Sequence, residues 1–580
     1  MKIESLSIKN FRGIKNAELI FNGHTVIVGD NNVGKSTIIE AIDLVLGPER
    51  LSRYPIIDEH DFYAGDYIGP AENSIIIEIE ALIIDLNEEQ LRHFRNHLEW
   101  WDIEDKELID SPPVAVTDDE NVKPALRVCF KGGYDKEEDD FYGNTFFCSP
   151  ISDELELPKF GTRDKRLCGF IYLRTIRTGS RALSLDKGSL LDIILKLKEI
   201  RPQMWEDVLC QLRQLTVADN PELGISEILE SIQSATRDIV PVEWAENPKL
   251  QVSEMTRSHL RKILTVFIGT GAKNSKGEEY SAPFQHQGTG TINALVLTLL
   301  SMIAELKQNV IFAMEEPEIA IPPYTQKRII SSIIQKSAQA IFTSHSPYIL
   351  EEFPPEQILV IKRESDGNLR GTSANPPVKQ KFYREEFRKR LCEGLLARRV
   401  LIAEGRTEYD SFPACAKKLN LLKPDKYRNF DTLGIAFINA ETDSSIAKFG
   451  EYFRNLGKEV FAVFDQQTKE DLEKIESCVD HCYEAPEKGF ENVIINGIST
   501  KILKKYALNL VKLGDWPTHI QPEPDDTMTG DEIKPIMLKF LKGRKGSGDA
   551  AELLFRCKRK EMPEFIVTTI KDINRKIKKS

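Results

Sequence analysis

The chain has 580 residues, of which 41% are hydrophobic and 29% are charged. This length exceeds what one hydrophobic core usually supports, so we expect two or three domains, and the composition excludes the disordered and fibrous classes. The net charge of −12 excludes a uniformly basic nucleic-acid coat, but two stretches are basic: residues 377–400 hold eight Lys or Arg against three Asp or Glu, and residues 541–580 hold twelve against five.

The cysteine usage and the apolar runs indicate the cellular compartment. Nine cysteines form no CxxC pair, and the opening MKIESLSIKNFRG lacks the apolar core of a signal peptide. The longest apolar stretch, TINALVLTLLSMIAEL, falls short of the roughly 20 residues that span a bilayer. We therefore expect a cytoplasmic protein with no membrane span.

The first part of the chain predicts an α/β domain. KIESLSIKNFRGIKNAELIF predicts two short strands around a turn, HTVIVG predicts a third strand, and residues 35–46 predict a helix. NSIIIEIEALII, further along, predicts a long strand.

A glycine-rich loop, GDNNVGKST, lies between the third strand and this helix. Its spacing is that of a phosphate-binding loop, in which backbone amides at a helix amino terminus point at phosphate oxygens. Lys35 would reach the β and γ phosphates of ATP, and Ser36 would offer its hydroxyl to magnesium. Asn32, Gly34 and Thr37 complete the expected nucleotide site.

The middle of the chain changes from helical spacing back to alternating strands and helices. Residues 181–265 have apolar residues at helical spacing, which predicts a helical insert. The later strand VIFAMEEPE ends in Glu315 and Glu316, an acidic pair suited to hold the magnesium shell and to polarise the attacking water, respectively. IFTSHSP ends the next strand at His345, which is placed to sense the γ phosphate.

Together with QHQGTGTINALVLTLL, these motifs resemble the ABC-type ATPases of the RecF and SMC kind. The resemblance implies that Gly288, Thr289 and Gly290 contact ATP bound by a second subunit, so that ATP joins two heads. GTG stands where relatives carry serine and two glycines, and EEPEIAIPP lacks the leucine, histidine and proline that are common after the acidic pair. No long heptad array follows the phosphate loop, which excludes an SMC protein with its extended coiled coil.

The last third carries a second acidic constellation. ARRVLIAEGRTEYDSF predicts a buried strand ending at Glu404, with Glu408 one helical turn beyond, and KEVFAVFDQQTKED predicts another ending at Asp465. GFENVI adds Glu491, and LKGRKGSGDAAELL adds Lys545. Carboxylates at strand ends of an α/β sheet suit magnesium, and two ions could activate water for phosphodiester cleavage.

This pattern resembles a Toprim domain, and an ABC-type head followed by Toprim resembles the OLD (overcoming lysogenization defect) family of ATP-dependent nucleases, to which the nuclease subunit of the Gabija antiphage system is related. The resemblance implies an α/β chain with an ATPase head in two parts, a helical dimerisation insert between them, and a Toprim nuclease domain. The corresponding residue ranges are 1–180, 266–375, 181–265 and 395–580.

The same resemblance assigns the site residues of Toprim. Glu404 and Glu408 would bind metal, Asp465 would bridge two ions, Glu491 would complete the set, and Lys545 would stabilise the charge of the transition state. Toprim domains usually carry aspartate, any residue, aspartate, whereas here the run is Asp465, Gln466, Gln467. Gln467 offers an oxygen ligand but no charge.

The resulting hypothesis is an ATP-regulated DNA endonuclease that uses Mg²⁺ or Mn²⁺, forms a homodimer or a larger even oligomer, and acts in antiphage defence, alone or with a partner such as a helicase-like protein. Both basic stretches would hold the DNA backbone. The alternative is an ATP-dependent DNA-binding or sensor protein whose Toprim domain has weakened catalysis. Whether ATP activates or restrains cleavage stays open, because both would use the same residues.

Overall fold

The structure is a computed structural model without ligands. It describes residues 1–48, 55–69, 74–109, 121–149, 157–173, 185, 189–198, 201–214, 225–237, 256, 260–261, 264–307, 309–319, 321–377 and 385–579. The chain divides into two compact units. Unit 1 comprises Met1–Glu4, Ile39–Glu59 and Tyr67–Thr343, and unit 2 comprises Ser5–Ile38, His60–Asp66 and Ser344–Ser580.

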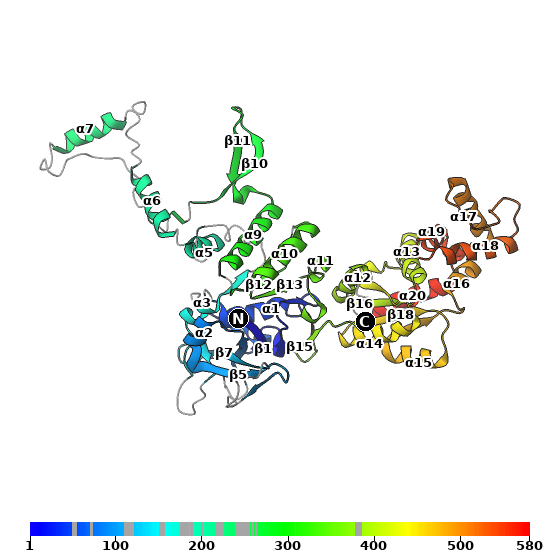
Figure 1. Cartoon of the computed structure of the whole chain (residues 1–580), viewed down its shortest axis with the longest axis horizontal. Helices are drawn as coiled ribbons and strands as arrows, with labels where there is room; N and C mark the ends of the chain where they lie inside the picture. Colours follow the sequence, from blue (N-terminus) through cyan, green and yellow to red (C-terminus); the bar gives the residue numbers. More distant parts are fainter. Residues whose placement is uncertain are drawn as a thin grey trace. The chain divides into compact units, whose positions relative to one another are not determined.

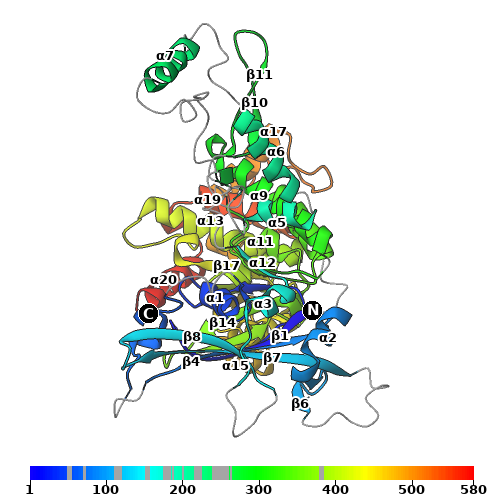
Figure 2. The same cartoon turned by 90° about the vertical axis from the view of Figure 1, so that its left-hand side faces the viewer.

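Unit 1 contains an antiparallel set of strands and a parallel set. Long strand β7 pairs with β4 on one side and with β5 and β8 on the other (Figure 2), and β6 extends β5. In the parallel set, β12 lies between β9 and β13. The strands are β4 (Ile77–Ile84), β5 (Leu98–Asp102), β6 (Glu107–Ile109), β7 (Val122–Asp135), β8 (Asp140–Phe147), β9 (Phe170–Leu173), β12 (Ile311–Glu315) and β13 (Gln339–Thr343), with a separate hairpin of β10 (Phe267–Lys273) and β11 (Glu279–Pro283).

The helices of unit 1 include the expected helical stretch between the two head parts. They are α2 (Glu88–Phe94), α3 (Thr162–Cys168), α5 (Leu190–Leu197), α6 (Arg201–Gln214), α7 (Ile225–Arg237), α9 (Thr289–Lys307) and α10 (Pro323–Lys336). Three of them, α5 to α7, fall within residues 181–265, while much of the rest of that range lies outside the described residues. The domain boundaries themselves stay predictions.

Helix α9 corrects the expectation that the longest apolar stretch is too short to span a bilayer. It has 19 residues, so length alone does not exclude a membrane span, and residues 289–306 are long and apolar enough to cross a bilayer. Core helices of water-soluble proteins satisfy the same criterion. Here α9 packs against α5 and α10 (Figure 1), and its Val296, Leu300 and Ile303 are buried. These contacts bury part of its apolar surface, while Met302 and Leu306 are exposed.

In unit 2, the strands of the head place the phosphate loop. The order is β1, β2, β15, β14, β3, in which β2 runs parallel to β15 and β14 runs parallel to β3. Their bounds are β1 (Lys2–Phe11), β2 (Ile14–Ile20), β3 (Thr25–Val28), β14 (Ile358–Arg363) and β15 (Asn368–Ser373). All four residues of β3 are buried, which fits a strand covered on both faces, and helix α1 (Lys35–Leu46) follows it.

The Toprim region of unit 2 is built on a four-stranded parallel sheet in the order β17, β16, β18, β19. Every residue of β16 (Arg399–Ala403) is buried, as expected for a central strand of a parallel sheet, and so are five of the six residues of β18 (Glu459–Phe464). The edge strands are β17 (Ile435–Asn439) and β19 (His481–Glu484). From β16 the chain moves outward to β17 and then returns past β16 to β18, so the connections diverge at β16.

Helices cover both faces of this sheet. Helix α13 lies on one face and α14 and α15 on the other (Figure 1), while Gly394 of α12 approaches Phe453 of α14. Further helices form a cluster beside α13 whose core includes Phe412, Phe490, Tyr506, Phe540 and Leu553. The helices of this region are α12 (Glu385–Leu396), α13 (Arg406–Leu422), α14 (Asp443–Asn455), α15 (Lys469–Cys478), α16 (Phe490–Gly497), α17 (Thr500–Leu513), α18 (Gly530–Gly543), α19 (Asp549–Arg556) and α20 (Glu564–Lys579), and α11 (Pro347–Leu350) precedes them between β13 and β14.

Candidate functional site

The acidic side chains of the Toprim region meet at one edge of its sheet. Glu404 follows β16 and Asp465 follows β18, and these strands are paired neighbours with Ala403 opposite Val463. The amide of Glu404 donates to the carbonyl oxygen of Val463 at 3.1 Å, which continues the ladder past the last strand residue. Open α/β sheets bind ligands in the crevice where the connections diverge, at the carboxyl ends of the strands. The carboxylates occupy that position.

Hydrogen bonds fix the two strand-end carboxylates. Oε2 of Glu404 accepts from the amide of Asp465 at 2.9 Å and from Nε2 of Gln467 at 3.1 Å. Oδ2 of Asp465 accepts from the amide of Gly489 at 2.8 Å. Gly489 has a φ of +87°, in the left-handed region that favours glycine, and it precedes α16.

Glu491 lies on the first turn of α16 and is almost fully buried. Its Oε1 accepts from the hydroxyl of Thr407 at 2.6 Å, and Nζ of Lys545 lies 3.2 Å from the same oxygen. Thr407 belongs to α13, the helix that also carries Glu408. Three separate segments, around residues 407, 491 and 545, therefore converge on one point.

The electrostatics of the cluster favour a cation. Burial, with smaller contributions from the nearby charges of Asp465, Glu404 and Glu491, raises the pKa of Glu408 to about 8. Burial is also the main cause that raises the pKa of Glu404 and of Asp465. Oδ1 of Asp465 is buried and has no hydrogen-bond donor among the described residues. Hard carboxylate oxygens with an unpartnered acceptor among them are a donor set that fits magnesium or manganese.

The cluster does not form a closed coordination sphere. Within the part of the chain that the structure describes, no three His, Cys, Asp or Glu side chains are arranged to hold one ion. The ammonium of Lys545 lies beside Glu491, and the side-chain amide of Gln467 donates to Glu404 and to the carbonyl oxygen of Asp465. The structure thus brings the expected residues together, while the geometry of metal binding stays a prediction.

The loop that carries Lys545 is held by Asp549, which sequence reasoning missed. The buried carboxylate of Asp549 lies 2.8 Å from Nε of Arg544, and it accepts from the hydroxyl of Ser547 at 2.5 Å and from the hydroxyl of Tyr506 at 3.3 Å. The side chain of Lys545 is more than half exposed. The bonds that its neighbours Arg544 and Ser547 make to Asp549 therefore restrain the backbone at Lys545. The only signal in the sequence was the polar, glycine-rich run GRKGSGD.

The phosphate loop of unit 2 connects β3 to α1, in the order that its sequence predicts. Nζ of Lys35 donates to the carbonyl oxygens of Gly29 and Asp30 at 2.9 Å each, and the lysine is buried across its own loop. Gly34 has a φ of +119°, which side chains rarely adopt. Ser36 and Thr37 lie in the first turn of α1, and Asn32 is exposed with a φ of +62°. The first-turn amides of a helix generally lack intrahelical partners and suit a phosphate.

The remaining nucleotide-site candidates occupy loops at the ends of other elements. Glu315 ends β12 and accepts a hydrogen bond from the hydroxyl of Tyr172 on β9. Glu316 follows with a φ of +45°, an unusual conformation for a residue with a side chain. Both glutamates belong to unit 1. His345 is exposed just after β13 and belongs to unit 2.

The expected signature loop is at the amino terminus of a helix. Gly288 and Thr289 are exposed where α9 begins, and Gly290 lies in its first turn. A side chain at Gly288 would meet no atom within 4 Å in its own chain. This accessibility is what contact with a nucleotide of a second subunit requires.

Comparisons with known proteins match this organisation. The model of the AAA ATPase domain matches residues 1–160 and 181–350, more than half of the chain, and the model of the Toprim domain of overcoming lysogenization defect-like proteins matches residues 395–466. The chain therefore belongs to the family of proteins with this AAA ATPase domain, and it carries a Toprim match of the overcoming lysogenization defect type. The expected fold class, an ATPase head followed by a Toprim α/β domain, is confirmed.

OLD-family relatives are distant in sequence. The chain is 22% identical over 417 residues to Endonuclease GajA of Bacillus cereus (strain VD045), covering 70% of this chain and 66% of the relative. It is 22% identical over 445 residues to OLD nuclease of Thermus scotoductus, covering 73% of this chain and 75% of the relative. Among solved structures, the SMC head domain from Thermotoga maritima covers 65% of this chain and 100% of its own, with 12% identity and a TM-score of 0.29.

Proposed function

We propose that the chain is an ATP-regulated DNA endonuclease that depends on divalent metal and nicks or cleaves phosphodiester bonds. The observation that carries this proposal is the group of carboxylates from Glu404, Glu408, Asp465 and Glu491 at the diverging edge of the Toprim sheet, with a buried oxygen of Asp465 left without a donor. OLD-family relatives whose names include endonuclease and nuclease support the same activity.

Each residue has a role that its position supports. Glu404, Glu408, Asp465 and Glu491 would hold Mg²⁺ or Mn²⁺, with Gln467 as a neutral oxygen ligand. When bound there, the metal supplies a Lewis acid that activates water and neutralises charge on the leaving oxygen. Lys545 would place its ammonium against the nonbridging oxygens of the scissile phosphate, where negative charge accumulates in the transition state.

The ATPase head supplies the regulation in this proposal. Lys35, Ser36 and the amides of residues 32–37 would bind the phosphates and magnesium, and Glu315 and Glu316 would act on the metal and the attacking water. His345 would sense the γ phosphate. The exposed GTG loop of residues 288–290 would complete the nucleotide site of a second subunit, as in ABC-type heads.

We infer a homodimer or a larger even oligomer from the same arrangement. Helix α7, in the predicted dimerisation insert, exposes Ile228 and Ile232 four residues apart on one side of the helix. The family resemblance further supports antiphage defence in the cytoplasm, with or without a helicase-like partner. DNA is the proposed substrate because the Toprim region presents basic side chains beside the carboxylates.

The rival function is an ATP-dependent DNA-binding or sensor protein with weakened catalysis. Gln467 favours it, since the residue that usually supplies a second carboxylate here donates its amide to Glu404. This arrangement uses one Glu404 oxygen that a metal ion would otherwise contact.

A plasmid-nicking assay with Mg²⁺ or Mn²⁺ separates the two functions. Native protein is expected to nick, and Glu404→Ala is expected to be slower by about a hundredfold or more. The control variant Glu473→Ala changes an exposed acid of α15 and should nick like the native chain. If the native chain binds DNA but does not nick with either metal, with or without ATP, the sensor function replaces the nuclease.

A further inference from the structure

A basic groove lies on the helical part of the Toprim region. It has a volume of about 1040 Å³ and is bordered by α17, by the end of α19 and by the residues that follow α19. The cationic side chains that line it are Lys501, Lys505, Lys512, Arg556 and Lys558. None of them is among the residues assigned above to metal, nucleotide or catalysis.

The positive charge of this groove is poorly balanced. Asp526 and Glu561 are the acids of its lining, and Glu561 already accepts from the amide of Lys558 at 2.7 Å. Arg556 pairs with Glu552 at 2.5 Å, but within the described residues the four lysines of the groove make no ion pair. Gathered cations repel one another, and a polyanion that displaces their counterions relieves this repulsion.

The spacing of the lysines suits a nucleic-acid backbone. Lys501, Lys505 and Lys512 follow one another at helical spacing along the side of α17 that lines the groove. From the first to the last they span about 16 Å along the helix axis. That length corresponds to about five phosphates of one strand of B-form DNA.

The groove is joined to the loop of Lys545 by a buried tyrosine. Tyr506 lines the groove from α17, and its hydroxyl donates to Asp549, the residue that also holds Arg544 and Ser547. The ring of Tyr506 lies 5.1 Å below the guanidinium of Arg556. A ligand in the groove would therefore contact groups that are one hydrogen bond away from the Asp549 brace.

We propose that this groove binds the sugar–phosphate backbone of duplex DNA outside the scissile bond, without reading base sequence. The inference rests on the proposed nuclease function, because it treats the ligand as a second segment of the same DNA. Its contacts are point charges on flexible side chains, which bind phosphates without distinguishing bases.

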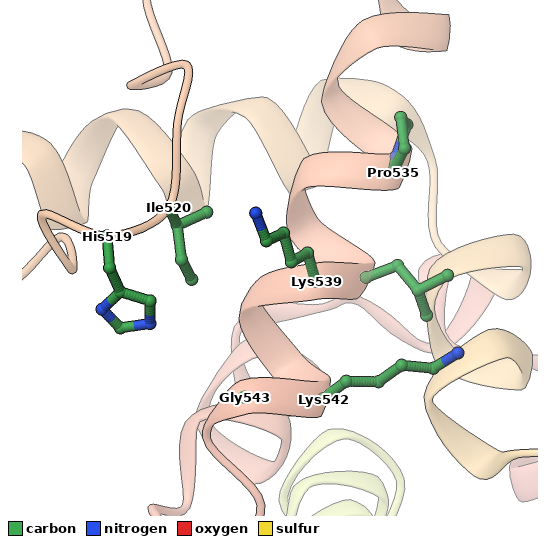
Figure 3. A pocket seen from close by; sticks show the side chains of 7 residues that line it. His519, Ile520, Pro535, Lys539, Lys542 and Gly543 are labelled. Carbon is green, nitrogen blue, oxygen red and sulfur yellow. The ribbon is translucent and has the colours of Figure 1, made fainter.

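A second hollow on the same helical part gives weaker support for DNA binding. Figure 3 shows this hollow, of about 530 Å³, with Lys539 and Lys542 on α18 and His519 on the facing loop. The two lysines extend in different directions from the helix, and Ile520 and Pro535 add apolar surface. These groups form no continuous row of cations, so the DNA track is assigned to α17.

The test uses the full chain in EDTA, so that binding is measured without cleavage. Fluorescence anisotropy with a labelled 30-base-pair duplex compares native protein, the triple variant Lys501→Gln, Lys505→Gln, Lys512→Gln, and a control triple variant. The control, Lys448→Gln, Lys469→Gln, Lys474→Gln, removes the same charge from exposed sites on α14 and α15, on the opposite face of the sheet. We expect the groove variant to bind at least about tenfold more weakly and to lower the slope of log K against log salt by about 2.7.

The outcomes separate this inference from the proposed function. If the groove variant binds with the native affinity and salt slope, or loses no more than the control, the groove is not a DNA track, whatever the nicking assay gives. If only the groove variant loses DNA affinity while the native chain fails to nick, the DNA track is supported and the nuclease function is rejected. If the groove variant loses affinity for a single-stranded probe but keeps its affinity for the duplex, the proposal that the ligand is duplex DNA is contradicted.

Discussion

Two buried ionisable side chains show opposite uses of charge in this protein. Glu408 is buried among other carboxylates, and this burial is the main cause of its raised pKa. Lys165, in α3, is fully buried and donates to the carbonyl oxygen of Leu44 at 2.7 Å, and burial lowers its pKa to about 7 although Asp43 opposes the change. The glutamate belongs to a functional cluster, whereas the lysine links α3 to the end of α1.

Lys165 should make stability depend on pH. The unfolded lysine keeps its proton up to its ordinary pKa of 10.5, while the folded one loses it near 7. Between these values the unfolded chain binds the additional proton, so stability rises with pH, by at most about 1.4 kcal/mol per unit. Calorimetric melting between pH 7.5 and 9 should show this rise for the native chain and a smaller one for Lys165→Met. Parallel curves for the two proteins would show that the buried lysine does not titrate in this range.

At the scale of elements, the loop between α18 and α19 carries Lys545, the lysine proposed to stabilise the transition state. Its glycines at 546 and 548 both have positive φ, so the backbone alone holds Lys545 loosely. Asp549 offsets this freedom by tying Arg544, Ser547 and Tyr506 together. We infer that Asp549 is a positioning residue, which would act on a bound phosphate through Lys545.

Replacing Asp549 should therefore lower turnover more than DNA affinity. We expect Asp549→Asn to reduce kcat by about tenfold, with KM for DNA changed less than twofold, because misplacement of a charged group costs transition-state stabilisation. Glu552→Gln is the matched control, since Glu552 bonds Tyr506 and Arg556 but not the loop. Equal kcat for both variants, or a loss seen only in KM, would rule out the positioning role.

The elements that sequence could predict are those whose signal is local. Buried strands followed by an acid identified Glu404 and Asp465, and the glycine spacing identified the phosphate loop. Asp549 and Tyr506 are 43 residues apart and were not predictable, because nothing in either segment specifies the other. The lysines of α17 escaped notice because apolar residues separate them along the chain, and only the helical turn brings them to one side. Gln467 was expected to face metal, whereas in the structure it also donates to Glu404.

At the scale of the whole molecule, the two acidic systems belong to different compact units. The phosphate loop and the Toprim carboxylates are in unit 2, and Glu315 and Glu316 are in unit 1. A nucleotide at the phosphate loop can change the rate of cleavage only if it binds two states of the chain with different affinities. Regulation by ATP would then require Lys35, whether ATP activates or restrains cleavage.

Titrating ATP and a non-hydrolysable analogue into the nicking assay measures that coupling. Both nucleotides are expected to change the rate of the native chain in the same direction, and neither should change the rate of Lys35→Ala. Lys276→Ala, in the exposed turn between β10 and β11, serves as the control and should respond like the native chain. A nucleotide response that persists in Lys35→Ala would place regulation outside the phosphate loop.

The ion pair between Glu491 and Lys545 has a consequence for how such enzymes diversify. It shows that the chain leaves the catalytic edge after residue 491 and returns to the same spot at residue 545, having built α17 and α18 in between. The exposed turns of a segment whose two ends meet can vary with little disturbance to the scaffold, whereas its buried Tyr506 and Phe540 are tied to the core beside α13. New preferences for DNA shape could therefore arise in this excursion while the cutting chemistry stays the same.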